Sequence, residues 1–485
     1  MFYTMFFILF AALILLCFHF ANKRGERLIG KVVKISTVIF ISLSMLNVFL
    51  PDLFACSLEI NDLSSMTGTK FHSVIRWLNL VCFTVLPIAV FQKNKYFEKI
   101  ASYFCLPVAL INVCCYHQYI KYFTANSNSG LQTVSILSRS FKDFLINEGF
   151  RAAIFGITCL SQLIALALLT YQNRERLSIK KDELKNFIII LLGLIYLSLP
   201  VYVPQHLVGH VNIMMTRFSP VHIIWILGIV AIIVALYFIF RNKSSEAKYL
   251  LVLAMSWSLM IQFSYMFIAS CELNIMKLPL QLCNLGSYLA LLMLLKKSER
   301  IYHFTLIVNV VGAIIAICIL DISKDSSHLS RLWVVHYIVE HTRVLVIPIL
   351  CLVLGVFKPI TKKSIKDFSV GFTVYYLFVF ALGTLSNGVY RLCAGKAYQN
   401  FFYANHLFMF DKSIAKELLG FTDPLFDNCV IKIGVFEIYP LVQLSVYLVF
   451  MAICLGVYTL IYALTSKHKK QPKVTTAGNT HYTIA

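Results

Sequence analysis

The chain has 485 residues, of which 59% are hydrophobic and 13% charged, whereas soluble domains hold about 45–50% and about 25%. The apolar surplus comes in runs of about 18 residues or more, the length of a transmembrane helix, which excludes an ordinary soluble protein. A net charge of +21 is also typical of nucleic-acid-binding proteins. Here the basic residues lie between the apolar runs, so we expect membrane topology to explain the charge and no nucleic-acid partner.

Thirteen apolar segments follow one another along the chain, and most of them contain no charged residue. Their approximate bounds are 3–20, 32–54, 73–91, 100–117, 151–171, 187–204, 220–240, 249–270, 278–295, 301–320, 332–357, 368–389 and 439–464. Segment 332–357 is the clearest exception, because it has Glu340 and Arg343 well inside it. The sequence predicts an all-α polytopic membrane protein with about 13 transmembrane helices.

Lys and Arg alternate in density between successive loops. The loops 21–31, 92–99, 172–186, 241–248, 296–300 and 358–367 and the tail 466–485 carry 26 of them in 77 positions, and the intervening loops carry 13 in 132. Because basic loops stay in the cytoplasm, we predict an N-terminus outside and a C-terminus in the cytoplasm. The first segment has basic residues after it and none before it, so we interpret it as an anchor and not as a cleaved signal peptide.

The helix pattern recurs within the chain. A basic stretch leads into an apolar helix at 172–187 and again at 358–368, and short basic turns occur at 92–99 and 296–300. These recurrences indicate two parallel six-helix repeats plus one final helix, although shared hydropathy also produces some of this similarity. We therefore predict three parts. They are an N-terminal six-helix half (1–210), a C-terminal seven-helix domain (211–466) and a basic cytoplasmic tail (467–485).

The eleventh segment carries a polar stripe. At 100° per residue, Glu340 lies about 40° from His336 and Arg343 about 20° to its other side, while His341 lies about 140° away. Charged side chains inside a membrane face the protein interior and usually mark function. The alternative is structural: Glu340 and Arg343 have the spacing of an ion pair, and both histidines then only lock helices together.

The ninth segment begins with Pro279, which suits the first turn of a helix. Gln281, Asn284 and Tyr288 share one helix face, and Cys283 lies beside it. Since the ninth and eleventh segments both begin on the outer side, we expect Cys283, His336 and His341 at a similar depth. A cysteine beside a histidine is the arrangement of nucleophilic catalysis, but Cys283 also fits a plain core position.

Cysteine spacing points to no other site. The 14 cysteines contain no C-x-x-C pair, so neither a zinc site nor a disulfide framework is predicted. We expect no metal at His336 and His341 either, because their spacing is not the i, i+4 pair that metalloproteases use. Cys393 and Cys429 share one outer loop, and the sequence leaves open whether they form a disulfide.

Four motifs carry a resemblance to a known family. They are Pro279-Leu-Gln-Leu-Cys283, His336-x4-His341 with an apolar run ending in Phe357-Lys-Pro359, Asn405-His-Leu-Phe-Met-Phe410, and Tyr439-Pro440. With these motifs, residues of about 210–465 resemble the YwaF-like integral membrane proteins of bacteria, which are similar to the eukaryotic transmembrane protein 164 family. The bacterial family has seven helices, and the last seven predicted segments supply that number.

The resemblance implies acyl transfer between phospholipids, because the eukaryotic family is associated with that activity through a membrane cysteine and a histidine. By position, Cys283 is then the acyl-accepting nucleophile, and His336 or His341 the base. The substrate contacts expected around them are Gln281, Asn284, Tyr288, Glu340, Arg343, Asn405 and His406. Without gaps, the first half places Phe155 and Leu160 opposite the two histidines, so we expect that half to be scaffold.

The first functional hypothesis is thus a phospholipid acyltransferase that takes its substrate from the bilayer and needs no cofactor, since the chain has no P-loop or G-x-G-x-x-G motif. The alternative is a transporter or flippase for a lipid or small polar solute, based on the parallel halves and on Asn309, Ser386 and Asn387. A purely structural scaffold is the third. The sequence predicts a multi-pass integral membrane protein and fixes neither the plasma membrane nor the endoplasmic reticulum, nor the oligomeric state.

Overall fold

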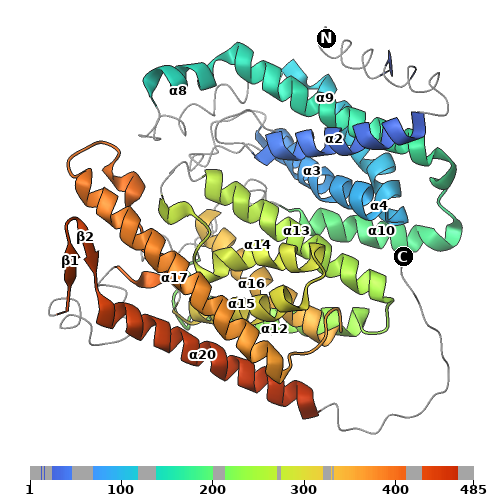
Figure 1. Cartoon of the computed structure of the whole chain (residues 1–485). Helices are drawn as coiled ribbons and strands as arrows, with labels where there is room; N and C mark the ends of the chain where they lie inside the picture. Colours follow the sequence, from blue (N-terminus) through green and yellow to red (C-terminus); the bar gives the residue numbers. More distant parts are fainter. Residues whose placement is uncertain are drawn as a thin grey trace.

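Apolar helices make up most of the part of the chain that the structure describes (Figure 1). The computed structural model describes residues 25–45, 69–117, 138–199, 213–269, 275–319, 332–410 and 429–467, together with residues 12, 13, 16 and 329. The predicted all-helical architecture is correct for these residues, with one short β-hairpin in addition.

The helices of the N-terminal half lie between residues 25 and 197. They are α2 (Gly25–Met45), α3 (Thr69–Pro87), the π-helical turn η2 (Ile88–Gln92), α4 (Lys95–Ile100), the π-helical turn η3 (Ala101–Cys105), α5 (Leu106–Cys114), α8 (Arg139–Ile146), α9 (Glu148–Asn173), the 3-10 turn η4 (Arg174–Arg176) and α10 (Lys181–Leu197). Since α4, η3 and α5 follow one another without a break, they form one continuous rod.

The second half contributes longer helices and the hairpin. Its elements are α12 (Pro220–Phe240), α13 (Ser245–Ala269), the 3-10 turn η5 (Ile275–Lys277), α14 (Leu282–Leu295), α15 (Glu299–Ile319), α16 (Leu332–Val353), α17 (Lys362–Leu392), the 3-10 turns η7 (Gln399–Phe402) and η8 (His406–Phe408), β1 (Ile431–Ile433), β2 (Phe436–Ile438) and α20 (Pro440–Lys467).

Seven helical stretches of the described chain are long and apolar enough to cross a membrane. They are Lys95–Cys114, Glu148–Arg176, Pro220–Phe240, Glu299–Cys318, Val334–Val353, Lys362–Leu392 and Pro440–Thr465. Two further apolar helices, Trp77–Gln92 and Leu282–Leu295, are shorter. These helices make the chain a multi-pass membrane protein, while the count of thirteen, the orientation and the repeats stay predictions.

The predicted segments coincide with helical structure from 32–54 onward, whereas 3–20 and the tail 468–485 lie almost wholly outside the described residues. Several helices of the N-terminal half begin earlier than predicted, among them α4 at Lys95 and α10 at Lys181. Helix α2 begins at Gly25, so Arg27 and Lys31, which we expect in a loop, lie in its first two turns. Long basic side chains can occupy such helix ends because their charged groups reach the interface.

The hairpin is a feature that the all-helical prediction misses. Strands β1 and β2 pair antiparallel, with Ile433 opposite Phe436. Gly434 in the turn has a φ of 61°, a conformation that the tight turns of hairpins require and that glycine adopts without strain. Arg391 at the end of α17 holds the hairpin through Glu437, with Nη2 and Oε2 2.8 Å apart.

Helices α13 to α16 form the centre of the molecule, and each of them packs against at least two of the others. In Figure 1 the N-terminal helices (blue to green) cover one flank of this centre, and α17 and α20 (orange and red) cover the opposite flank. One apolar core extends from the N-terminal half into α13–α16, and a second lies among α15, α17 and α20. The central four helices are therefore shielded on both sides.

Contacts between loops join segments that we predict on the same side of the membrane. Arg300 Nε lies 3.4 Å from Asp367 Oδ2, which connects two loops predicted to be cytoplasmic. The N–H of Leu329 donates to the carbonyl of Ile213 (2.9 Å), which connects two predicted outer loops. Both contacts are in keeping with loops that alternate between the two sides of the membrane.

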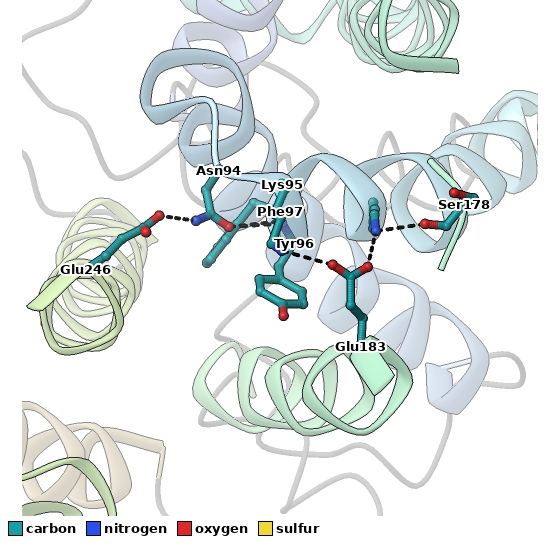
Figure 2. A network of polar contacts seen from close by, with 8 residues as sticks. Asn94, Lys95, Tyr96, Phe97, Ser178, Glu183 and Glu246 are labelled. Carbon is teal, nitrogen blue, oxygen red and sulfur yellow. Dashed lines mark hydrogen bonds and ion pairs between the residues drawn. The ribbon is translucent and has the colours of Figure 1, made fainter. Parts of the chain in front are cut away.

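A polar junction ties the two halves together at the basic loops (Figure 2). Glu183 in the first turn of α10 accepts from Lys95 Nζ at 2.9 Å and from Lys99 Nζ at 2.6 Å. Beside it, Asn94 Nδ2 donates to Glu246 Oε1 of α13 (2.7 Å). The junction therefore fixes α4 against both α10 and α13.

Replacing Glu183 by Gln is expected to lower the melting temperature near neutral pH, since the hydrogen bonds from Lys99 and Lys95 lower the pKa of Glu183 from 4.5 to about 2. Because the pKa of Glu183 is lower in the folded protein than its ordinary value of 4.5, the ionised carboxylate stabilises the fold above that pH. This stabilisation is lost as the pH falls toward the folded-state pKa. Thermal unfolding of the purified protein against pH checks this, with Glu175→Gln as the control because that carboxylate is 86% exposed. A deficit in Glu183→Gln that does not shrink in acid contradicts the assignment.

Candidate functional site

The start of α14 determines where Cys283 lies. We expect Pro279 in the first turn, but this is wrong: the helix begins at Leu282, with Gln281 as its N-cap residue. The segment before it is held in a non-helical conformation, because Tyr375 of α17 donates to the carbonyl of Leu280 (2.5 Å). Non-helical backbone at membrane depth occurs where it is buried in protein. Cys283 is thus the second residue of a short helix, at the end where the helix dipole favours negative charge.

Glycines let α14 and α15 approach closely. A Cβ atom built on Gly286 lies 2.0 Å from Asn309 Oδ1, and one built on Gly312 lies 2.9 Å from Leu282 Cβ and 3.1 Å from the backbone nitrogen of Cys283. Small residues at such interfaces allow helices in membranes to pack backbone against backbone. Gly312 therefore fixes the backbone of Cys283 against α15.

The thiol of Cys283 is half-buried and lies among polar groups of three helices. It donates to Asn284 Oδ1 on the same helix (3.3 Å). Helix α16, which carries Glu340, packs directly against α14, and the hydroxyl of Tyr375 on α17 donates to the carbonyl of Leu280, three residues before Cys283. The structure thus places Cys283 near the polar stripe of α16, although its thiol donates to Asn284 and not to a histidine.

His336 and Glu340 form a buried pair on α16. His336 Nε2 lies 3.2 Å from Glu340 Oε2, and both side chains are less than a tenth exposed. Phe263 of α13 stacks on the His336 ring with 6.1 Å between ring centroids, and Tyr288 of α14 meets Phe263 edge-on at 5.7 Å. A carboxylate on one ring nitrogen fixes the orientation and the tautomer of an imidazole. The pair therefore has the geometry of a base and its orienting group.

The second oxygen of Glu340 has a different environment. Glu340 Oε1 is buried and has no hydrogen-bond partner among the described residues. A buried acceptor without a donor is costly, and such a group is often part of a functional site. The oxygen is available to a hydroxyl or N–H donor from a substrate.

His341 lies on another side of α16. Its Nδ1 is 2.7 Å from the carbonyl of Tyr337, and the two rings pack with centroids 4.1 Å apart. Since a carbonyl only accepts, Nδ1 carries the proton and Nε2 keeps a lone pair in the neutral ring. His341 can accept a proton, but no carboxylate orients it within the described chain.

Arg343 does not take the role that the helix spacing allows. The alternative pairing with Glu340 is absent: Arg343 Nη1 donates to Ser258 Oγ (3.1 Å) and Nη2 donates to the carbonyl of Leu197 (3.0 Å). Helix α10 ends at Leu197, and the last carbonyls of a helix lack intrahelical donors. The guanidinium therefore turns toward the N-terminal half and away from the Cys283 region.

Gln281, Asn405 and His406 meet at a loop junction next to the start of α14. Gln281 Oε1 accepts from the N–H of Leu407 (3.1 Å), and His406 Nε2 lies 3.0 Å from the carbonyl of Ile275. Asn405 Oδ1 accepts from a backbone N–H of its own loop (2.9 Å). Each side chain holds backbone in place, so the junction positions the segment that leads into Cys283.

The polar residues on which the transport hypothesis depends also bond to backbone. Asn387 donates to the carbonyl of Ala404 and accepts from its N–H (2.7 and 3.1 Å), and Ser386 donates to the carbonyl of Phe402 (2.5 Å). Asn309 Nδ2 is 3.3 Å from two backbone carbonyls. Side chains that bond in this way connect helices and loops, and they do not favour transport over acyl transfer.

The N-terminal half has a polar centre of another kind. Asn79, Asn112 and Gln162 are buried on α3, α5 and α9, and they bond to one another at 2.7–3.2 Å. Phe155 and Leu160, which the repeat places opposite the histidines, lie in the apolar core. Three amides that satisfy one another are structural.

Metal and disulfide chemistry find no support in this region. No group of three or more His, Cys, Asp or Glu side chains that could hold a metal occurs among the residues that the structure describes. Cys393 and Cys429 are both free thiols.

Sequence reasoning misses several contributors to this region. Phe263 stacks on His336, Tyr375 lies by Cys283, and Ser258 and Gln262 bind the end of α10 at Leu197. Ser258 and Gln262 recur four residues apart on an apolar helix, which is a signal for a polar stripe facing protein. Phe263 and Tyr375 give no such signal, because aromatic residues are common throughout the chain.

Fold and site together define a multi-pass integral membrane protein with a buried polar region around a half-buried cysteine. The sequence model of the TMEM164 family matches residues 217–462, just over half of the chain. The chain belongs to the TMEM164 family. This confirms the resemblance that the four motifs indicate, and the matched range contains the helices from α12 to α17 and α20 as far as Tyr462. No curated protein and no solved structure matches the chain.

Proposed function

We propose that this protein transfers acyl groups between membrane lipids through a thioester on Cys283. The observation that carries the proposal is the buried His336–Glu340 pair, 3.2 Å apart, on a helix that packs directly against α14, where Cys283 lies. Nucleophile, base and orienting carboxylate are the parts of a cysteine acyl-transfer site. The family of the chain adds weight to the same chemistry.

In the first step, His336 takes the thiol proton and the Cys283 sulfur attacks the ester carbonyl of a phospholipid. The ester C–O bond breaks, and the leaving lysolipid oxygen takes the proton from the imidazolium. In the second step, a hydroxyl of the acceptor lipid attacks the thioester, His336 removes its proton, and the thiol is restored. A protonated His336 stabilises a thiolate beside Glu340, because its charge offsets both anions.

The substrate comes from the bilayer, and neither step consumes a cofactor. An acyl chain dissolved in lipid reaches a site below the membrane surface without crossing water, and a water-poor site slows hydrolysis of the thioester. The unpartnered Glu340 Oε1 is a suitable acceptor for the hydroxyl of the incoming lipid.

Acyl-biotin exchange on the purified full chain tests the thioester. After incubation with phospholipid, a hydroxylamine-released thiol is expected at Cys283 in the wild type and in Cys351→Ala, and it is expected to disappear in Cys283→Ala. Cys351 is a matched control because it is a buried cysteine on α16. A chase with lysophospholipid is expected to move the acyl group onto the new lipid, which distinguishes transfer from simple palmitoylation.

No label at Cys283 in the wild type, with phospholipid supplied, eliminates the thioester mechanism. Transport across the membrane is then the leading function. Label at Cys283 that the chase does not release indicates a static lipid modification, and it also removes support for transfer.

A further inference from the structure

The end of α10 lies outside the family match and contacts the helix that carries His336 and Glu340. The carbonyl of Leu197 accepts from Arg343 Nη2 (3.0 Å), Ser258 Oγ (2.5 Å) and Gln262 Nε2 (3.1 Å). Gln262 also donates to the carbonyl of Leu199 (3.2 Å). The carbonyls at a helix C-terminus carry partial negative charge, so this end is a suitable partner for a buried guanidinium.

Helix spacing offers the same guanidinium another partner, Glu340, which it does not bind in the structure. Arg343 follows Glu340 by three residues, the spacing at which opposite charges pair on a helix surface. Glu340 Oε1 is buried and unpartnered among the described residues, and burial makes an unpaired carboxylate oxygen costly. The two groups are apart in the structure, where one hydrogen bond from each Nη atom holds the guanidinium toward Ser258 and the carbonyl of Leu197.

We propose that the C-terminal end of α10 is a positioning element that keeps Arg343 away from Glu340, so that the carboxylate stays available to His336. The proposal deepens the proposed function, because it gives the N-terminal half a role in the chemistry of the other half. The N-terminal half acts through Arg343 without touching the substrate. Arg343 is then a positioning residue and not a substrate contact.

Weakening the hydrogen bonds that hold Arg343 to Ser258 and Leu197 is expected to slow the reaction with little effect on substrate binding. In Ser258→Ala, Arg343 loses one of its acceptors and can turn to Glu340, which deprives His336 of its orienting group. We expect kcat to fall about tenfold with little change in KM. Adding Arg343→Gln to Ser258→Ala removes the competing charge, and kcat is expected to return to that of Arg343→Gln alone.

Ser256→Ala is the matched control for the kinetic measurement. Ser256 is buried on the same helix, and its hydroxyl has no hydrogen-bond partner among the described residues. Its replacement by Ala should leave kcat unchanged. A kcat that stays low in the double variant, or that falls equally in Ser256→Ala, overturns the proposal, since a general loss of packing then explains the effect.

Thermal unfolding of the full chain in nanodiscs tests the arrangement without any activity. The double-mutant cycle of Arg343→Gln with Ser258→Ala is expected to depart from additivity by about 2 °C or more. The cycle of Arg343→Gln with Glu340→Gln is expected to be additive. Coupling between Arg343 and Glu340 in the otherwise native chain overturns the proposal, whatever the enzyme does.

The two readouts separate this inference from the proposed function. If the cycles come out as expected and the wild type transfers no acyl group, the anchoring of Arg343 is upheld and acyl transfer is eliminated. If the wild type transfers acyl groups and the cycles fail, the proposed function stands and α10 loses its positioning role.

Discussion

His336→Gln is expected to slow the loading of an acyl group onto Cys283 by about a hundred- to ten-thousand-fold, the usual contribution of a general base. Gln keeps much of the size and polarity of His and cannot take a proton at neutral pH. Glu340→Gln should slow loading less, because it keeps a hydrogen-bond partner for His336 and loses only the charge. Single-turnover loading in nanodiscs, followed by mass spectrometry of the Cys283 peptide, measures these rates.

His341→Gln is the matched control for that series. His341 is a buried histidine on the same helix, with its Nδ1 bound to the carbonyl of Tyr337. We expect loading within about threefold of the wild type, because no carboxylate among the described residues pairs with this histidine. A large loss in His341→Gln with near-normal loading in His336→Gln shows that His341 is the base.

Gly286→Ala is expected to have the largest effect on stability. The added Cβ lies 2.0 Å from Asn309 Oδ1, so α14 and α15 must separate or Asn309 must leave its place. Overpacking of this kind costs about 1–3 kcal/mol, and the shift also moves the start of α14, where Cys283 lies. A drop in melting temperature with loss of Cys283 loading is the expected pair of results.

Two further variants define the cause of that loss. Gly456→Ala in α20 places its Cβ in open space, and we expect no loss of stability, since Ala favours a helix over Gly by about 1 kcal/mol. Combining Gly286→Ala with Asn309→Ala removes the clashing atom, and part of the lost stability should return. Equal melting temperatures for Gly286→Ala and Gly456→Ala contradict the close approach of α14 and α15.

Hydropathy and helical periodicity predict much of this fold because they report where a helix meets lipid or protein. The stripe of His336 and Glu340 is an example: the spacing predicts that the two share a face, and they form a pair in the structure. Spacing alone does not choose between two neighbours on one stripe. Glu340 has both His336 and Arg343 within reach on its own helix, and only distant parts of the chain decide which one it takes.

The boundary of α14 could not be predicted for a related reason. The sequence around Pro279 is compatible with a helix beginning there. The observed start instead requires the loop 404–410 and Tyr375 of α17 to bind the backbone of Ile275 and Leu280 and the side chain of Gln281. The short strands of the hairpin likewise depend on Gly434 and on docking against Arg391. Such tertiary contacts override the local conformational preferences of the sequence, and no local sequence pattern predicts them.

The capping of α10 has a consequence for biosynthesis. The donors that satisfy the carbonyl of Leu197 come from Ser258 and Arg343, which are separated from it by 61 and 146 residues along the chain. During synthesis the end of α10 therefore lacks these hydrogen-bond donors until α13 and then α16 have been inserted. Lipid offers a bare carbonyl no donor. A polypeptide released before α16 is made thus lacks the Arg343 donor, and only the side chains of α13 reach the carbonyl of Leu197.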